Sequence, residues 1–146
     1  MKITPNKPGP DGKMSNEGRV WIREYDYDSG LKVISWRDGD KNTPPAEKGH
    51  MLHVNYQGYL EDGTIFSEIQ SETPEQTFKF RLGYGQVIPG WDEAFEGMRV
   101  GDYRTFIIPP YLAYGDEGSR NGDIPPNSIL IFEVNLVGMT GQPGEK

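Results

Sequence analysis

Hydrophobic and polar residues alternate along much of this chain with a period of two, which is the pattern of half-buried strands. The segments that alternate in this way or form short apolar runs are residues 31–34, 52–56, 78–82, 106–108 and 129–137. In the second of these, Leu52, Val54 and Tyr56 share one face, while His53 and Asn55 share the other. The pattern predicts a domain built mainly from strands.

Turn residues separate the predicted strands. Residues 27–30 (YDSG) lie between the apolar segments 20–22 and 31–34, so we expect a hairpin there. Residues 62–63 (DG) predict a tight turn, and residues 38–48, which are polar and contain two adjacent prolines, predict a loop. Hairpins and tight turns of this kind join antiparallel strands.

One short helix is predicted, from Pro89 to Met98. Pro89 suits the first position of a helix, and the Asp92 carboxylate suits its positive end. Trp91, Phe95 and Met98 fall on one side at helical spacing. An antiparallel sheet packed over one short helix is an α+β arrangement, and the periodicity alone allows more than one fold of that class.

The two ends of the chain differ in composition from its middle. Residues 1–18 contain three prolines and three glycines with only scattered apolar side chains. Such a segment buries too little apolar surface to offset the entropy of ordering it, so it predicts a flexible arm. Residues 141–146 predict a flexible tail for the same reason, which leaves residues 19–140 as one domain.

Composition and charge narrow the functional classes. A chain of 146 residues is long enough for a single core, and we expect a monomer. It has 15 basic and 22 acidic side chains, a net charge of −7, and no basic stripe, so nucleic acid is not an expected partner. No apolar run approaches the ~20 residues of a membrane span. The absence of cysteine removes thiolate nucleophiles and cysteine–zinc sites.

The motifs predict neither a cofactor nor a metal. His50 and His53 are the only histidines, and their spacing on a strand places them on opposite faces. Residues 83–85 (GYG) lack the third glycine of a dinucleotide loop, and residues 116–127 lack the terminal glutamate of a calcium loop. No signal-peptide pattern follows the first methionine, which slightly favours the cytoplasm, although a mature exported chain would look the same.

Aromatic residues recur in a set of short motifs. These are residues 54–56 (VNY), 60–66 (LEDGTIF), 78–80 (FKF), 87–91 (VIPGW), 113–115 (AYG) and 124–134 (IPPNSILIFEV). In this order and spacing they resemble the FKBP-type peptidyl-prolyl isomerases, along roughly residues 28–138. The resemblance implies an antiparallel twisted β-sheet wrapped over one short α-helix.

The resemblance also implies a function and a set of site residues. The function is cis–trans isomerisation of X–Pro bonds in polypeptide substrates, assisting protein folding, with macrolides of the FK506 and rapamycin type as candidate inhibitors. The positions that match the family's catalytic pocket are Tyr56, Phe66, Ile88, Trp91, Tyr114 and Phe132. The positions that match its other substrate-binding residues are Ser67, Phe78, Gln86, Val87 and Ile124.

Several of these residues have a particular role by resemblance. Trp91 would form the pocket floor, the Ile88 N–H would donate to a ligand carbonyl, and the Tyr114 hydroxyl would point into the pocket. Residues 116–123 match the family's flap, here one residue longer, with Ile124 at its pocket-facing end.

Two positions depart from the family pattern. Ser67 stands where the family usually has an aspartate, and a hydroxyl lacks the charge and reach of a carboxylate. Gln86 stands where many members carry glutamate. Ser67 keeps open an alternative function, a peptide-binding or chaperone module with little isomerase activity. A structural domain without a ligand is a third interpretation, but it leaves the clustered aromatic residues unexplained.

Overall fold

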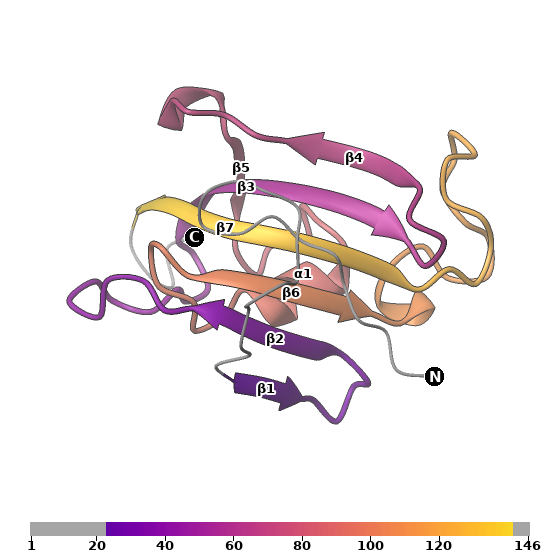
Figure 1. Ribbon diagram of the computed structural model, residues 1–146, viewed down its shortest axis with the longest axis horizontal. Helices are drawn as coiled ribbons and strands as arrows, with labels where there is room; N and C mark the ends of the chain where they lie inside the picture. The colour runs from indigo at the N-terminus through magenta and orange to yellow at the C-terminus, as the bar shows by residue number, and fades with distance from the viewer. Residues whose placement is uncertain (1–22, 142–146) are drawn as a thin grey trace.

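The structure, a computed structural model, describes residues 23–141. Its seven strands form one antiparallel sheet (Figure 1). They are β1 (Arg23–Asp26), β2 (Lys32–Arg37), β3 (Met51–Leu60), β4 (Ile65–Ile69), β5 (Phe78–Arg81), β6 (Tyr103–Ile108) and β7 (Leu130–Thr140). The helix α1 (Pro89–Ala94) lies between β5 and β6, and the single 3₁₀ turns are η1 (Pro74–Gln76) and η2 (Pro110–Leu112).

The sheet has the strand order β1-β2-β6-β7-β3-β4, with β5 also paired to β3. The long strands β3 and β7 lie side by side at its centre, from Met51 opposite Thr140 to Leu60 opposite Leu130. β5 and β4 divide the other edge of β3, because β5 pairs with its first residues and β4 with residues 56–59. The chain leaves the sheet after β4 and returns as β5, so Asn55 of β3 lies between these two pairings.

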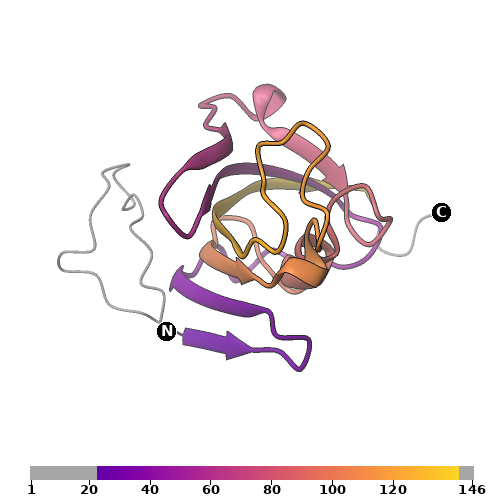
Figure 2. The ribbon, with the colours of Figure 1, turned by 90° about the vertical axis from the view of Figure 1, so that its right-hand side faces the viewer.

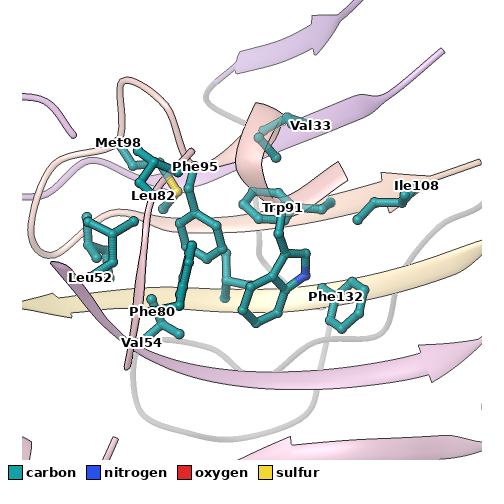
Figure 3. Packing of buried hydrophobic residues seen from close by; sticks show 14 of the residues in the cluster. Val33, Leu52, Val54, Phe80, Leu82, Trp91, Phe95, Met98, Ile108 and Phe132 are labelled. Atoms are coloured by element: carbon teal, nitrogen blue, oxygen red, sulfur yellow. The ribbon is translucent and has the colours of Figure 1, made fainter. Parts of the chain in front are cut away.

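The core lies between the sheet and α1. Apolar residues on the inner face of the strands pack against Trp91 and Phe95 (Figure 3). The rings of Phe80 and Phe95 are 5.3 Å apart, and those of Phe95 and Phe106 are 4.9 Å apart, both nearly edge to face. Burial of large aromatic rings in this geometry stabilises the fold beyond the area that they remove from water. Gly90 lets the helix approach β6 closely, because a Cβ there would lie 2.6 Å from Ile108 Cγ2.

The predicted α+β class is confirmed, and so are the hairpin, the tight turn and the loop. Gly30 N–H donates to the Tyr27 carbonyl in the turn between β1 and β2, and residues 62–63 form the turn between β3 and β4. Within the described residues β1 begins at Arg23, so the predicted strand residues 20–22 lie outside them. The predicted arm, residues 1–18, also lies outside the described range, as does most of the predicted tail.

The predicted helix end is wrong. The helix stops at Ala94 instead of Met98. Beyond it the backbone bonds to the loop before β3, since the Ala46 N–H donates to the Met98 carbonyl and the Gly97 N–H donates to the Ala46 carbonyl. Gly97 takes a φ of +90°, which does not continue a helix. Phe95 and Met98 are nevertheless fully buried, as their spacing predicts.

Within residues 23–141, no helix is both long enough and apolar enough to span a bilayer.

Candidate active site

A cavity of about 320 Å³ opens between the concave side of the sheet, the start of α1 and the segment between η2 and β7. Its volume is at the lower end of the range for small-molecule sites. It is lined by Tyr56, Phe66, Ser67, Phe78, Gln86, Val87, Ile88, Trp91, Tyr114, Ser119, Asn121, Asp123, Ile124 and Phe132. All eleven residues singled out in the sequence therefore border this one cavity. In Figure 2 the orange segment that closes it lies in front of the curved strands.

Four aromatic rings form the inner walls. The Tyr56 ring lies 5.0 Å from that of Trp91 at 86°, and the Phe132 ring lies 5.2 Å from Trp91 at 79°. Phe66 stands edge to face on Phe132 with a centroid distance of 5.5 Å. Each ring is held by another at nearly a right angle, so the walls are rigid before any ligand arrives.

Gly58 makes room for two of these rings. It lies on β3, opposite Ser67 of β4 and Phe132 of β7. A Cβ there would lie 2.7 Å from Phe132 Cε1 and 2.8 Å from Phe66 Cζ. Neither ring could stay where it is beside any larger residue. The absence of a side chain at this position is therefore part of the construction of the pocket.

Trp91 forms the floor of the cavity and is also part of the core, with 4% of its surface exposed. Its indole Nε1 is buried without a hydrogen-bond partner. Figure 3 shows this nitrogen on the side of the indole that faces Phe132, and the two rings meet nearly edge to face.

The start of α1 supplies a free backbone donor. Ile88 caps the helix with extended backbone angles, and its carbonyl accepts the N–H of Trp91 at 3.0 Å. The Ile88 N–H has no acceptor within residues 23–141. Pro89 occupies the first helical position, where a proline removes no needed hydrogen bond. Ile88 also lines the cavity, so this segment brings an amide donor without an acceptor next to it.

Ser67 forms a hydrogen bond with Tyr56 on the cavity wall. Its Oγ lies 2.7 Å from the Tyr56 hydroxyl, and either group can be the donor. The pairing of β3 with β4 places Ser67 opposite Gly58, two positions after Tyr56. Tyr56 therefore has a neutral partner at the position where the family usually has an aspartate.

Gln86 closes the turn after β5. Its amide oxygen accepts the Arg81 N–H at 2.8 Å, which leaves the NH₂ group to face a ligand. The same turn is fixed from the helix, because Asp92 accepts the N–H groups of Gly83 at 2.8 Å and Gly85 at 3.1 Å. Val87 and Ile88 follow directly, so these contacts set their position on the cavity wall.

The segment 116–123, which we call the flap, is held by its own hydrogen bonds. Ser119 N–H donates to the Ile124 carbonyl at 2.9 Å, and Ile124 N–H donates to Ser119 Oγ at 2.9 Å. Ile124 is buried at 5% exposure, whereas Tyr114 at the base of the flap is 42% exposed. The flap is therefore preceded by an exposed aromatic ring, that of Tyr114, and followed directly by a core residue, Ile124.

The flap also contributes three polar lining residues that the sequence did not identify, Ser119, Asn121 and Asp123. Asn121 connects them, because its side-chain oxygen accepts from Ser119 Oγ at 2.7 Å and its amide donates to Asp123 Oδ2 at 3.1 Å. Within residues 23–141, Asp123 is the only charged residue that lines the cavity. The alternation of small polar residues and glycine was the available signal, but it is typical of any exposed loop. Among the residues that the structure describes, no cluster of three or more metal-ligating side chains occurs.

A model of the family described as "FKBP-type peptidyl-prolyl cis-trans isomerase" matches residues 42–137, which run from before β3 into β7. The chain belongs to this family. Over 107 residues it is 48% identical to FK506-binding protein 2 of Yarrowia lipolytica, covering 73% of this chain and 70% of that one. It is 45% identical over 135 residues to the peptidyl-prolyl cis-trans isomerase FKBP53 of Arabidopsis thaliana, covering 92% of this chain but 26% of that protein.

Solved structures agree with the FKBP fold. The crystal structure of AtFKBP13 superposes with a TM-score of 0.69 at 36% identity, covering 82% of this chain and 100% of that one. FkpA from Escherichia coli gives a TM-score of 0.69 at 34% identity, covering 82% of this chain and 53% of that one. The domain is therefore a peptidyl-prolyl cis–trans isomerase of the FKBP type.

Proposed function

We propose that the cavity binds the prolyl ring of a polypeptide substrate and accelerates rotation about the preceding amide. The observation that carries this proposal is the aromatic box of Tyr56, Phe66, Trp91 and Phe132 with the free Ile88 N–H at its rim. A proline ring is compact, apolar and without an N–H, so it fits such a box at no cost in lost hydrogen bonds.

Rotation about the X–Pro amide requires no covalent step from the protein, only an environment that favours the twisted amide. The barrier of ~20 kcal/mol arises from amide resonance, and rotation breaks no bond, so no nucleophile takes part. The planar amide is polarised by resonance and well solvated by water, whereas the twisted amide has lost that polarisation. An apolar cavity therefore raises the free energy of the planar form relative to the twisted one.

Donors at the rim add to this effect. The Ile88 N–H is placed for a substrate carbonyl, and the Tyr114 hydroxyl is the second candidate donor. Donors that are stronger partners for the twisted geometry would stabilise it selectively. A rate gain on the order of 10⁴ requires only about 5.5 kcal/mol from all of these contributions together.

Ser67 does not remove the basis for catalysis. Its bond to the Tyr56 hydroxyl keeps a polar wall in the position where the family has a carboxylate. The aromatic box is independent of it. Macrolides of the FK506 and rapamycin type are candidate inhibitors for the same pocket, with an affinity that depends on how well a hydroxyl replaces the carboxylate.

Asp123 indicates which substrates are preferred. Its exposed carboxylate is the only charge on the cavity lining, and Asn121 fixes its direction. A lysine or arginine next to the substrate proline would be attracted to it, and the net charge of −7 acts in the same sense over longer distances. We therefore expect basic residues around the proline to be favoured.

A protease-free assay of cis–trans relaxation on a proline tetrapeptide tests the function. We expect catalysis that rapamycin inhibits, and a loss of tenfold or more in kcat/KM, on the order of 1.4 kcal/mol, for Phe66→Ala. Tyr111→Ala removes an aromatic ring that is 64% exposed and does not line the cavity, so it is the matched control. Wild-type protein that binds the peptide without accelerating relaxation would favour the chaperone alternative.

A further inference from the structure

A second cavity, of about 200 Å³, lies away from the prolyl pocket and shares none of its lining residues. β1, the loop after β2, the loop after α1 and the start of β6 contribute to it. Its lining residues are Arg23, Asp38, Gly39, Lys41, Gly97, Arg99, Asp102 and Arg104. In Figure 1 the loop after β2 is at the left end of the sheet and the flap is at the right end.

The lining of this cavity is positively charged. Four of its side chains are cationic and two are anionic, which leaves a surplus of two positive charges in a chain whose net charge is −7. Local charge of the sign opposite to that of the whole molecule is not explained by composition. It has to be explained by what each of these groups contacts.

Both carboxylates already have partners. Asp102 accepts the Gly39 N–H at 2.6 Å on one oxygen and the Arg99 N–H at 3.0 Å on the other. Asp38 forms an ion pair with Arg23, and that hydrogen bond holds the pKa of the Asp38 carboxyl below its ordinary value. These contacts hold both carboxylates in place, so neither is free to pair with Lys41 or Arg99.

Arg104 lines the cavity with a side chain that is mostly buried. Its side chain is 10% exposed, and the Tyr25 ring covers it at 5.2 Å from Cζ. Asp102 reaches only a terminal nitrogen, at 3.4 Å, and Nε is buried without a hydrogen-bond partner. A guanidinium has five N–H donors, and a buried donor without an acceptor is costly.

Two further cations form no ion pair with a carboxylate within residues 23–141. The Arg99 guanidinium donates to the carbonyls of Thr43 and Lys41, which are neutral acceptors. The Lys41 ammonium forms no ion pair within residues 23–141. Both side chains border the cavity that Arg104 lines, so three cations surround one polar space.

We propose that this cavity binds a compact oxyanion of the phosphate type, either inorganic phosphate or the phosphate of a phosphorylated polypeptide. The Lys41 ammonium and the Arg99 guanidinium supply the charge and the donors, and Arg104 adds a third cation to the lining. A phosphate carries close to two negative charges at neutral pH, which matches the surplus. Residues 1–22 carry four basic and two acidic side chains, so that segment does not supply the complementary charge.

The test is a titration of the ¹⁵N-labelled full chain at pH 7.5, followed by ¹H–¹⁵N spectra that include the arginine Nε–H signals. Sodium phosphate is compared with sodium chloride at equal ionic strength, which removes the effect of screening. We expect a saturable shift of the Arg99 Nε–H and of the Gly39 and Asp102 amides with phosphate only. Equal shifts with both salts would overturn the proposal.

Two variants locate the binding. Lys41→Gln should weaken phosphate binding by about fivefold, while Lys79→Gln, the same change on β5 outside both cavities, should not. Arg99→Gln removes the second cation without a carboxylate partner, so it should also weaken phosphate binding. If this variant does not fold, the comparison of Lys41→Gln with Lys79→Gln decides, and equal affinities would contradict the site.

A second titration identifies the source of the anion. A phosphoserine peptide without proline is compared with its unphosphorylated form and with inorganic phosphate. Tighter binding of the phosphopeptide assigns the site to phosphorylated polypeptides, and equal binding assigns it to the free anion. Lys41→Gln should leave isomerisation of a neutral tetrapeptide unchanged, because it does not line the prolyl pocket.

Discussion

The Tyr56 hydroxyl lies 2.7 Å from the Ser67 hydroxyl and joins β3 to β4 on the wall of the prolyl pocket. Tyr56 also packs edge to face on Trp91 at 5.0 Å. One residue thus connects the polar wall of the pocket to its apolar floor. Replacement of its partner should change ligand affinity without disturbing the aromatic box.

Ser67→Asp tests this relationship. The carboxylate is a stronger acceptor than a hydroxyl, so we expect macrolide affinity to stay equal or to rise by up to about tenfold, on the order of 1.4 kcal/mol. Calorimetric titration with rapamycin measures the change, and Ser67→Asn is the neutral control of similar size. A marked fall in affinity for Ser67→Asp alone would mean that the pocket is built around the serine.

Gly58→Ala tests the construction of the pocket. The added Cβ would lie within 3 Å of both Phe66 and Phe132, so the rings must move, and we expect kcat/KM to fall by at least tenfold. Gly138→Ala is the matched control on β7, where the nearest atom to a Cβ is 3.7 Å away, on His53. Thermal melts of both variants separate pocket damage from general destabilisation, and an active, folded Gly58→Ala would contradict the geometry.

Asp123→Asn tests the charge preference. For a tetrapeptide with lysine before proline we expect kcat/KM to fall by about two- to fivefold, as for an exposed charge pair. For the alanine analogue we expect no change. The preference of the wild type for lysine should also shrink at high salt, because exposed charges are screened. No difference between the two peptides would show that Asp123 does not select substrates, while the isomerase activity itself would stand.

Tyr59→Phe tests a pH dependence on the outer face of the sheet. Burial, and then the nearby Glu133 carboxylate that accepts its O–H at 2.6 Å, raise the pKa of the Tyr59 phenol well above its ordinary value. A raised phenol pKa contributes stability that is present below about pH 10 and is lost as the pH rises toward the folded-state pKa.

We therefore expect the free energy of unfolding of the wild type to fall above pH 10, with up to about 1.4 kcal/mol per pH unit from this group. Tyr59→Phe should show a shallower fall in urea denaturation between pH 8 and 11. Tyr111→Phe, at an exposed tyrosine, should keep the wild-type slope. Identical slopes in all three proteins would show that Tyr59 does not cause the loss of stability above pH 10.

Deletion of residues 1–18 tests the predicted arm. Its composition lacks a periodic apolar pattern, so we expect folding and isomerase activity to remain nearly intact. Thermal melts and turnover compare the shortened chain, which begins at Arg19, with the full chain. A fall in melting temperature of more than about 5 °C, roughly 1 kcal/mol, would show that the arm packs on the domain.

The sequence by itself predicted five of the seven strands, the turns and the fold class. It did not predict β1 at residues 23–26 or β4 at residues 65–69. Alternation such as that of Leu52, Val54 and Tyr56 depends on the geometry of a single strand, which places successive side chains on opposite faces. Trp91, Phe95 and Met98 were correctly expected to be buried for a similar local reason. The membership of eleven residues in one pocket came from the resemblance to a family, and their individual roles stay predictions.

Only the tertiary structure decided how these pieces meet. The end of α1 depends on hydrogen bonds between Ala46 and residues 97–98, about fifty positions apart in the chain. The entry of Ser119, Asn121 and Asp123 into the pocket depends on how the flap folds back over the sheet. The cationic cavity brings together Arg23, Lys41 and Arg104 from segments that are distant in the sequence. Side-chain periodicity predicts which residues share a face of one helix or strand. It does not predict which elements pack against each other.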